Sequence, residues 1–431
     1  RTGADQPNND IPTAQQPTSQ EAIDVIQRAI LQLKIKEAKE KQQSEGHKFW
    51  KTQPVVQDEE ANPTECGPIE FKTLDQVPTK PYPLPKGFEW DLVDLTDDKQ
   101  LDEVYSLLYN NYVEDDDCHF RFHYSKEFLK WALMPPGYKK DWHLVVRRNN
   151  IPERPIIGLI TGIPCSLRVN DQKVTGVEIN FLCVHKNLRS KRVAPMLIKE
   201  VTRRVNLFDI WHATYTAGIV VPRPVSCAQY FHRSLNPKKL IDVGFSAKPR
   251  DQSILDVKKK YQLPKETANK LVPFSKEHVS SACALLNNFH KEKNAQLYQY
   301  FEEADFAHFF TPRKGINECY VIVDDEGKVT DLISFYYLPS TVFGVPEYNT
   351  LNVAYSFYNV ATSIPLSQLL NDSLILAKNG NADVFNMLDL MTNRETFKSL
   401  LFTPGDGTLH YYVYNWKCPQ FPESQLGLVL F

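Results

Sequence analysis

The sequence lacks three features that mark large classes of proteins. No apolar run approaches the ~20 residues that a membrane-spanning helix needs, so we expect no membrane span. The net charge is only −2, which leaves no global basic field to hold nucleic acid. No two cysteines form a CxxC pair or a metal-ligand spacing, so we expect no metal site.

Cysteine usage and length indicate the compartment and the number of domains. The eight cysteines are scattered along the chain, which is typical of reduced thiols and favours a cytoplasmic protein. The 431 residues exceed the length at which one hydrophobic core usually stops growing. We therefore expect two domains or two fused halves.

The first 46 residues predict a disordered tail followed by a basic helix. Residues 1–20 are polar and contain several prolines and glutamines, a composition typical of disorder. Helical spacing then joins Ile23, Ile26, Ile30 and Leu33, and lysines follow them. A solvated helix is the simple interpretation, and a ribosome-binding segment is the alternative.

Two later segments have the same pattern. Residues 156–185 and 330–360 each read as a strand, a turn near a proline (Pro164 or Pro339) and a second strand of mixed apolar and β-branched residues. A helical pattern follows each copy. The repeat predicts an α+β fold made of two related halves. The alternative is a coincidence between two hairpins of a common type.

A basic loop connects the strand at 178–184 to a helix that begins near Pro195. The first N–H groups of a helix lack internal partners and carry partial positive charge, so this loop is a candidate anion site. Its spacing resembles the pyrophosphate loop of the GCN5-related N-acetyltransferase fold, where glycine commonly stands at the position of Arg192. A solvated helix start is the alternative. The corresponding loop of the second copy, 361–365, has no basic residue, so we expect only the first half to bind coenzyme A.

Longer strings widen this resemblance to most of the chain. The segments EINFLCVHKNLRSKRVAPMLIKEVTRR (178–204) and LFTPGDGTLHYYVYNW (401–416) are similar to defining segments of the N-myristoyltransferases. Further strings match in order over roughly residues 47–431. The resemblance implies an α+β fold of two pseudo-symmetric GCN5-related N-acetyltransferase-like halves fused in one chain. Residues 47–247 would bind the acyl-CoA, and residues 248–431 would form most of the peptide-binding half.

The resemblance also implies a reaction. Myristate would pass from myristoyl-CoA to the N-terminal glycine amine of a peptide or nascent protein. Backbone N–H groups of Phe181 and Leu182 would hold the oxyanion, and the C-terminal carboxylate of Phe431 would be the base. Asn180 and Thr216 would line the path of the amine. We expect the enzyme to act as a monomer.

Binding residues are carried over position by position. The acyl-CoA site would comprise His47, Lys48, Phe49, Trp50, Leu182, Cys183, Val184, Arg189, Ser190, Lys191, Arg192, Val193, Ala194 and Pro195. The peptide site would comprise Tyr112, Glu114, Asp115, Asp116, Phe120, Phe122, Tyr215, Gly218, Tyr230, His232, Phe245, Ser340, Tyr355, Asp406 and Gly407.

Three other functions compete with this one. An acetyltransferase of the same fold would prefer a short acyl chain. An inactive acyl-CoA-binding protein would have lost the basic loop or the terminal carboxylate. A cysteine acyltransferase would use Cys183 as a covalent acyl carrier.

The acidic run at 114–117 predicts a preference for basic peptides. We expect charge reversal at Asp115 and Asp116 to raise KM more for peptides with a lysine or arginine several residues from the glycine than for neutral peptides. Steady-state kinetics with two matched peptides would measure this. Equal losses on both peptides would mean that the run is only a solvated loop.

Overall fold

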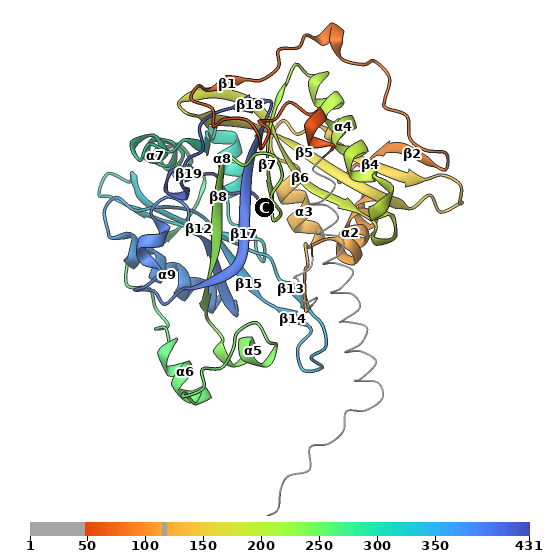
Figure 1. Ribbon diagram of the computed structural model, residues 1–431. Coiled ribbons are helices and arrows are strands. Elements are labelled where there is room, and N and C mark those ends of the chain that lie inside the picture. Colours follow the sequence, from red (N-terminus) through yellow and green to blue (C-terminus); the bar gives the residue numbers. More distant parts are fainter. Residues whose placement is uncertain (1–47, 114–118) are drawn as a thin grey trace, which may run out of the picture.

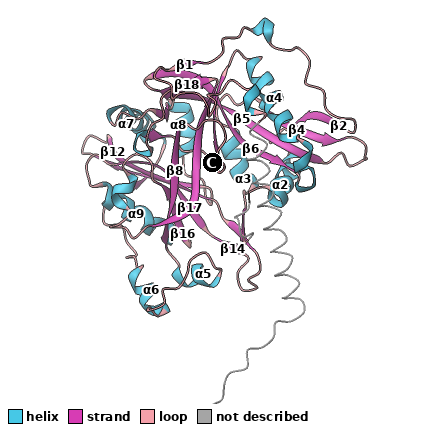
Figure 2. Cartoon of the chain, in the orientation of Figure 1, coloured by secondary structure: helices cyan, strands magenta, loops and turns pink. Residues whose placement is uncertain are grey.

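A continuous mixed sheet forms the body of the protein (Figure 1). The computed structural model describes residues 48–113 and 119–431. The strands form a 14-stranded sheet in the order β19-β10-β5-β6-β7-β17-β8-β16-β15-β12-β11-β9. In addition, β4 pairs with β5, and β2 pairs with β4. Figure 2 shows strands through the middle of the molecule with helices around them.

The elements have the following bounds. The helices are α2 (Asp98–Asn111), α3 (Lys126–Leu133), α4 (Val193–Asn206), α5 (Pro237–Asp242), α6 (Ile254–Lys260), α7 (Val279–Glu292), α8 (Glu303–Phe310) and α9 (Leu366–Asn379). The strands are β1 (Gly67–Pro68), β2 (Phe88–Leu92), β3 (Phe120–Phe122), β4 (His143–Arg148), β5 (Ile156–Val169), β6 (Gln172–Val184), β7 (His212–Ala217), β8 (Ser226–Ser234), β9 (Val272–Pro273), β10 (Leu297–Gln299), β11 (Asn317–Val323), β12 (Val329–Tyr337), β13 (Ser340–Val342), β14 (Thr350–Leu351), β15 (Val353–Val360), β16 (Val384–Leu388), β17 (Thr403–Tyr414), β18 (Trp416–Lys417) and β19 (Leu426–Gly427). Short 3-10 turns include η1 (Trp50–Thr52) and η4 (Lys186–Lys191).

The predicted repeat is confirmed. In the first half β5 and β6 pair antiparallel, α4 follows, and β7 returns parallel to β6. In the second half β12 and β15 pair antiparallel, α9 follows, and β16 returns parallel to β15. The expected α+β fold of two related halves is therefore present.

The turn predicted near Pro164 was wrong. β5 runs through Pro164, which pairs with Val177 of β6, and the chain reverses at Asn170 and Asp171. Both turn residues have positive φ, 47° and 65°, as two-residue hairpin turns require. One edge of β5 pairs with β6. The opposite edge pairs with β4 before Pro164 and with β10 after it, so it is unpaired at Pro164 itself, and a proline is tolerated there.

Each pair of hairpin strands is covered by helices on both faces. Leu101 and Val104 of α2 pack with Val145 and Leu159, whereas Leu197 of α4 packs with residues of the opposite face. Side chains alternate between the two faces of a strand, so the apolar runs in β4 and β5 fill two cores. In the second half α7 and α9 likewise belong to different clusters.

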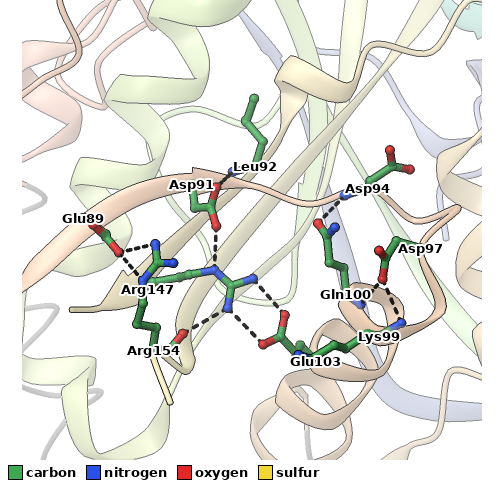
Figure 3. Close-up of polar contacts among 10 residues, drawn as sticks. All are labelled: Glu89, Asp91, Leu92, Asp94, Asp97, Lys99, Gln100, Glu103, Arg147 and Arg154. Carbon is green, nitrogen blue, oxygen red and sulfur yellow. Dashed lines mark hydrogen bonds and ion pairs between the residues drawn. The ribbon is translucent and has the colours of Figure 1, made fainter. Parts of the chain in front are cut away.

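A buried arginine ties the first strands to α2 (Figure 3). The Arg147 guanidinium is 8% exposed and donates to Asp91 at 2.7 Å and to Glu103 at 2.8 Å. It also donates to the carbonyl oxygen of Arg154 at 3.0 Å. Charge-assisted bonds of this kind compensate for the desolvation of a buried cation.

The C-terminal residues return into the body of the sheet. β17 pairs with both β7 and β8, and β19 pairs with β10. Gly427 of β19 lies close against His290 of α7. A Cβ on Gly427 would lie 2.7 Å from the His290 ring, so only glycine fits at this position. His290 is 2% exposed, and burial lowers its pKa to about 3.

Burial of His290 predicts that the free energy of unfolding decreases at acid pH. In the unfolded chain the His290 ring has a pKa near 6.5. Below that pH the unfolded chain therefore binds a proton that the folded chain does not bind. The stabilisation is therefore complete above pH 6.5 and is lost as the pH falls toward 3. We expect His290→Gln to lessen the loss of unfolding free energy between about pH 7.5 and about pH 5.5 by about 1.4 kcal/mol.

Urea denaturation at the two pH values would measure the effect. The same exchange at the half-buried His119 is the matched control. An unchanged pH dependence in the His290 variant would contradict the assignment.

Candidate active site

A β-bulge interrupts β6 where the oxyanion-binding residues were expected. Leu159 pairs with Cys183 and Thr161 with Asn180, so Phe181 and Leu182 together face one residue of β5. Phe181 has φ +50°, which non-glycine residues rarely adopt. Its ring is 1% exposed and packs on Tyr124 at 4.9 Å and Tyr112 at 5.8 Å. This packing holds the strained backbone in place.

Asn180 joins this bulge to the C-terminus. Its Nδ2 donates to a terminal oxygen of Phe431 at 2.7 Å, and its Oδ1 accepts from the Phe181 N–H at 2.8 Å. The Thr161 hydroxyl donates to the Asn180 carbonyl at 2.9 Å. One amide therefore links the end of the chain to the bulge, 251 positions earlier.

The C-terminal tail is buried, as its apolar sequence predicts. Leu428, Val429 and Leu430 are 0%, 8% and 5% exposed. The Phe431 ring packs against five aromatic rings at 4.6–5.9 Å, which belong to Trp131, Phe357, Tyr336, Phe128 and Phe309. Figure 1 marks this end of the chain at the centre of the molecule. The terminus is therefore anchored rather than frayed.

A second carboxyl group lies behind Asn180. Glu178 is 5% exposed, and its Oε1 lies 3.5 Å from the Asn180 Nδ2. Burial raises the pKa of Glu178 to about 7, although the hydrogen bond from Asn180 opposes the rise. The Asn180 amide is thus shared between two carboxyl groups in a desolvated region.

Thr216 lies level with Asn180 on the neighbouring strand. The parallel pairing of β6 and β7 ends at Glu178 and Thr214, and two further residues along each strand are Asn180 and Thr216. Thr216 is half-buried and pairs with Tyr411 on its other side. The two residues predicted for the amine path therefore occupy equivalent positions on β6 and β7, just past the point where the pairing of these strands ends.

The basic loop has the geometry of an unsatisfied helix start. Arg192 adopts φ +58° and gives α4 no side-chain cap, so the first N–H groups of α4 lack that partner. Glycine adopts this backbone region readily, whereas here the position is held by an arginine. Arg189 donates to the carbonyl of Asn111, and Arg189, Lys191 and Arg192 are all exposed.

α4 approaches the sheet closely at this point. A Cβ on Gly158 would lie 3.2 Å from both Val193 and Leu197, so glycine allows the helix to pack on β5. Of the other predicted acyl-CoA residues, Cys183 and Val184 are buried, Leu182 is exposed, and Ala194 and Pro195 are half-buried. Ser190 lies in η4.

The N-terminal arm lies across β7 and β17. Trp50 stacks on Tyr215 at 5.8 Å, and Tyr215 stacks on Tyr412 at 4.9 Å. Phe49 contacts Trp50 edge to face at 5.3 Å, and Lys48 is exposed. Since neighbouring residues of a strand face opposite sides, Tyr215 points away from the face that carries Thr216. It lies with the arm rather than with the predicted peptide residues.

Several of the predicted peptide residues form two groups of ring contacts. Phe122 contacts Tyr355 at 6.5 Å, Tyr230 contacts Tyr355 at 6.0 Å, and Phe245 contacts His232 at 5.2 Å and Phe120 at 5.9 Å. Further members join through pairing or proximity: Ser340 pairs with Phe122, Tyr112 contacts Phe181, and a Cβ on Gly407 would lie 3.5 Å from Tyr230. Asp406 and Gly218 are exposed.

Some predictions lie outside the described residues. These concern the tail and basic helix of residues 1–46, His47, and the acidic residues Glu114, Asp115 and Asp116. Across residues 48–113 and 119–431, no cluster of three or more histidine, cysteine, aspartate or glutamate side chains could hold a metal ion. Within the same ranges, no helix has the length and apolar character needed to cross a membrane.

The sequence analysis did not predict several residues that contact the predicted site residues. Tyr336 and Phe357 enclose the terminal ring, and Glu178 lies behind Asn180. Asn386 bonds to His232 at 2.6 Å across β16 and β8. Only Glu178 carried a usable signal, because a charged residue in an apolar strand is unusual.

Comparisons with known proteins agree with this geometry. Two family models match the chain: the N-terminal domain of myristoyl-CoA:protein N-myristoyltransferase over residues 68–228 and its C-terminal domain over residues 242–427. A glycylpeptide N-tetradecanoyltransferase of Dictyostelium discoideum is 49% identical over 387 residues, 89% of this chain and 92% of that protein. The Drosophila melanogaster protein of that name is 47% identical over 396 residues, 91% of this chain and 83% of that protein.

A solved structure is similar over nearly the same length. The crystal structure of Saccharomyces cerevisiae N-myristoyltransferase with bound myristoyl-CoA superposes with a TM-score of 0.85 at 40% identity, covering 89% of this chain and 99% of that chain. The chain therefore belongs to the family of myristoyl-CoA:protein N-myristoyltransferases, the enzymes classed as glycylpeptide N-tetradecanoyltransferases.

Proposed function

We propose that this protein transfers myristate from myristoyl-CoA to the N-terminal glycine of proteins by direct attack of the amine on the thioester. The observation that carries the mechanism is the hydrogen bond from Asn180 to the terminal oxygen of Phe431. It puts a carboxylate beside the bulge at Phe181 and Leu182, and Thr216 lies two residues past the last β6–β7 pair, as Asn180 does. A base, backbone donors and a polar path for the amine are thereby close together.

The terminal carboxylate is the base. The glycine amine attacks only in its neutral form, and its unperturbed pKa is near 8, so a proton has to leave it. The carboxylate takes one proton from the ammonium group and releases it to solvent. A C–N bond then forms to the thioester carbon, the C–S bond breaks, and a second proton passes from the nitrogen through the carboxylate to the departing thiolate. The products are the N-myristoyl amide and free coenzyme A thiol.

Backbone N–H groups of Phe181 and Leu182 stabilise the oxygen that becomes negative during the attack. The Phe181 N–H donates to Asn180 Oδ1 at 2.8 Å and not to the strand ladder, so its role in the oxyanion site requires that bond to be exchanged for one to the thioester oxygen. Preorganised donors of this kind typically contribute ~3–4 kcal/mol to an acyl-transfer transition state.

Two anion-attracting features support binding of the coenzyme A phosphates at the start of α4. The first is the uncapped helix N-terminus after Arg192. The second is the pair of exposed cations Lys191 and Arg192. The arm at Phe49 and Trp50 would cover the coenzyme from the other side, fixed by its stack on Tyr215.

A covalent acyl-cysteine is disfavoured at Cys183. The side chain is 3% exposed, and burial raises the pKa of its thiol to about 12. A thiolate is the nucleophilic form of cysteine, and this site holds very little of it at neutral pH. Direct attack by the amine needs no such intermediate.

Acyl transfer to short peptides tests the proposed function. Myristoyl-CoA, acetyl-CoA and palmitoyl-CoA would be compared as donors to a peptide that begins with glycine and to the same peptide beginning with alanine. We expect myristate to reach the glycine peptide alone. Acetyl transfer would instead make the protein an acetyltransferase, and tight acyl-CoA binding without transfer would make it a binding protein.

Changing only the terminal carboxylate tests the base. A semisynthetic chain that ends in the amide of Phe431 keeps the ring packing but loses the acidic group. We expect its single-turnover transfer rate to fall by ~10²–10⁴, the usual contribution of a general base, while myristoyl-CoA still binds. Removal of Leu430 and Phe431 together should abolish transfer as well.

Phe431→Leu is the matched control, because it removes the aromatic ring but keeps a carboxylate at the same position. It should retain far more activity than the amide. Normal turnover by the amidated enzyme would refute the assignment of the base.

A further inference from the structure

The N-terminal arm, residues 48–69, is held against the end of β17 and the residues that follow it by hydrogen bonds. The Tyr414 hydroxyl donates to Gln53 at 2.9 Å, and the Asn415 N–H donates to the Pro54 carbonyl at 3.0 Å. Single hydrogen bonds of this kind contribute little net stability. A firmer attachment at the end of the arm would therefore decide how readily the arm separates from the sheet.

The end of the arm pairs with the C-terminal part of the chain as β1 and β18 (Figure 1). Their antiparallel register places Gly67 opposite Lys417. The next position outward in this register places Cys66 opposite Cys418. Two cysteines from opposite ends of the chain are thus cross-strand neighbours.

This cysteine pair occupies a non-hydrogen-bonded position of the ladder. The Ile69 N–H donates to the Asn415 carbonyl, so that pair is hydrogen-bonded. Hydrogen-bonded and non-hydrogen-bonded pairs alternate along an antiparallel ladder, which makes Cys66 and Cys418, three positions further on, non-hydrogen-bonded. The Cα atoms of such a pair are about 4.5 Å apart, and both Cβ atoms point to the same face. A disulfide bridges Cα separations of about 4.4–6.8 Å.

Both thiols lie in the same apolar surroundings. Cys418 is 3% exposed and belongs to the main core cluster, and Cys66 packs against that cluster. Both are free cysteines. Burial, and after it the charge of Cys66, raises the pKa of the Cys418 thiol to about 12. An electrostatic effect of one sulfur on the other falls off with distance, so it agrees with the close approach that the register gives.

We propose that Cys66 and Cys418 form a disulfide under oxidising conditions, and that this bond fastens the N-terminal arm to the sheet and slows the exchange of acyl-CoA. The bond itself follows from the register and the shared surroundings of the two thiols. Its effect on acyl-CoA rests on the proposed function, because it needs the arm at Phe49 and Trp50 to cover the coenzyme.

The bond forms by two successive thiol–disulfide exchanges. The half-buried Cys66 is the accessible thiol, and its thiolate attacks a small disulfide such as oxidised glutathione. This step gives a mixed disulfide and releases one glutathione. The Cys418 thiolate then attacks the Cys66 sulfur and releases the second glutathione. The two protein thiols lose two protons and two electrons, and the electrons reduce the small disulfide to two thiols.

The pKa values of the two thiols predict how the rate depends on pH. Burial raises the pKa of Cys66 as well as that of Cys418, and the thiolate is the attacking form. We therefore expect the bond to form slowly at about pH 7 and faster at about pH 8.5.

Peptide mapping tests the bond directly. The whole chain would be incubated with oxidised glutathione, its remaining thiols blocked, and its proteolytic peptides analysed by mass spectrometry without reduction. We expect a peptide pair linked through Cys66 and Cys418, which is lost in Cys66→Ser and in Cys418→Ser. Cys227→Ser is the matched control, because Cys227 is an exposed thiol that pairs with His410, and it should leave the link unchanged.

Stopped-flow displacement of a fluorescent acyl-CoA measures the effect on the arm. We expect dissociation from the oxidised enzyme to be at least about 3-fold slower than from the reduced enzyme, because a cross-link restricts the opening of a segment that covers a ligand. Dithiothreitol should restore the faster rate. Cys66→Ser should show the faster rate after the same oxidation, and its transfer activity under reducing conditions should equal that of the wild type.

The outcomes distinguish this inference from the proposed function. Absence of the Cys66–Cys418 link after prolonged oxidation at about pH 8.5, or links from Cys66 to other cysteines in equal amounts, would overturn the bond. A complete link that leaves acyl-CoA dissociation unchanged would overturn its effect on the arm. Failure of the reduced wild-type enzyme to bind myristoyl-CoA or to transfer myristate would overturn the proposed function instead, and the peptide map would still decide whether the bond forms.

Discussion

The hydrogen bond between Asn180 and the terminal oxygen of Phe431 is the contact on which the site depends. It requires the last residue of the chain to be held inside the protein, although ordering a chain end costs ~1–2 kcal/mol of backbone entropy per residue. Burial of three apolar residues and enclosure of the Phe431 ring by aromatic side chains offset that cost, since each large apolar side chain contributes ~1.5–3 kcal/mol. The carboxylate is therefore positioned by packing, and Asn180 sets only its final direction.

The same region contains backbone that is unfavourable by itself. Phe181 and Arg192 both have left-handed φ values, which cost roughly 1–2 kcal/mol each in non-glycine residues. The first turns the N–H groups of a bulge out of the sheet, and the second gives α4 its abrupt, uncapped start. At Phe181 the strain is maintained because the ring is wedged between Tyr112 and Tyr124. Strain of this kind commonly occurs where backbone donors bind a ligand.

The sequence was sufficient for the elements but not for the contacts between distant strands. Periodicity predicted the repeat, α4 and α9, because the apolar spacing of those segments is regular. Pro164 was misread as a turn because nothing in the sequence tells that one edge of β5 is unpaired there. Alternation along β7 could have separated Tyr215 from Thr216, since adjacent strand residues face opposite sides. The contacts of Tyr336 and Asn386 depend on register between β12, β15, β16 and β8, which no local pattern encodes.

The strength of the proposed base follows from the charge around Asn180. In water a carboxylate is a poor base for an ammonium, because their pKa values differ by several units. Here Asn180 lies between the terminal carboxylate and Glu178, and burial raises the pKa of Glu178 to about 7. Burial disfavours the charged form of a carboxyl group, so the proposed base would become a better proton acceptor to the extent that it shares the surroundings of Glu178.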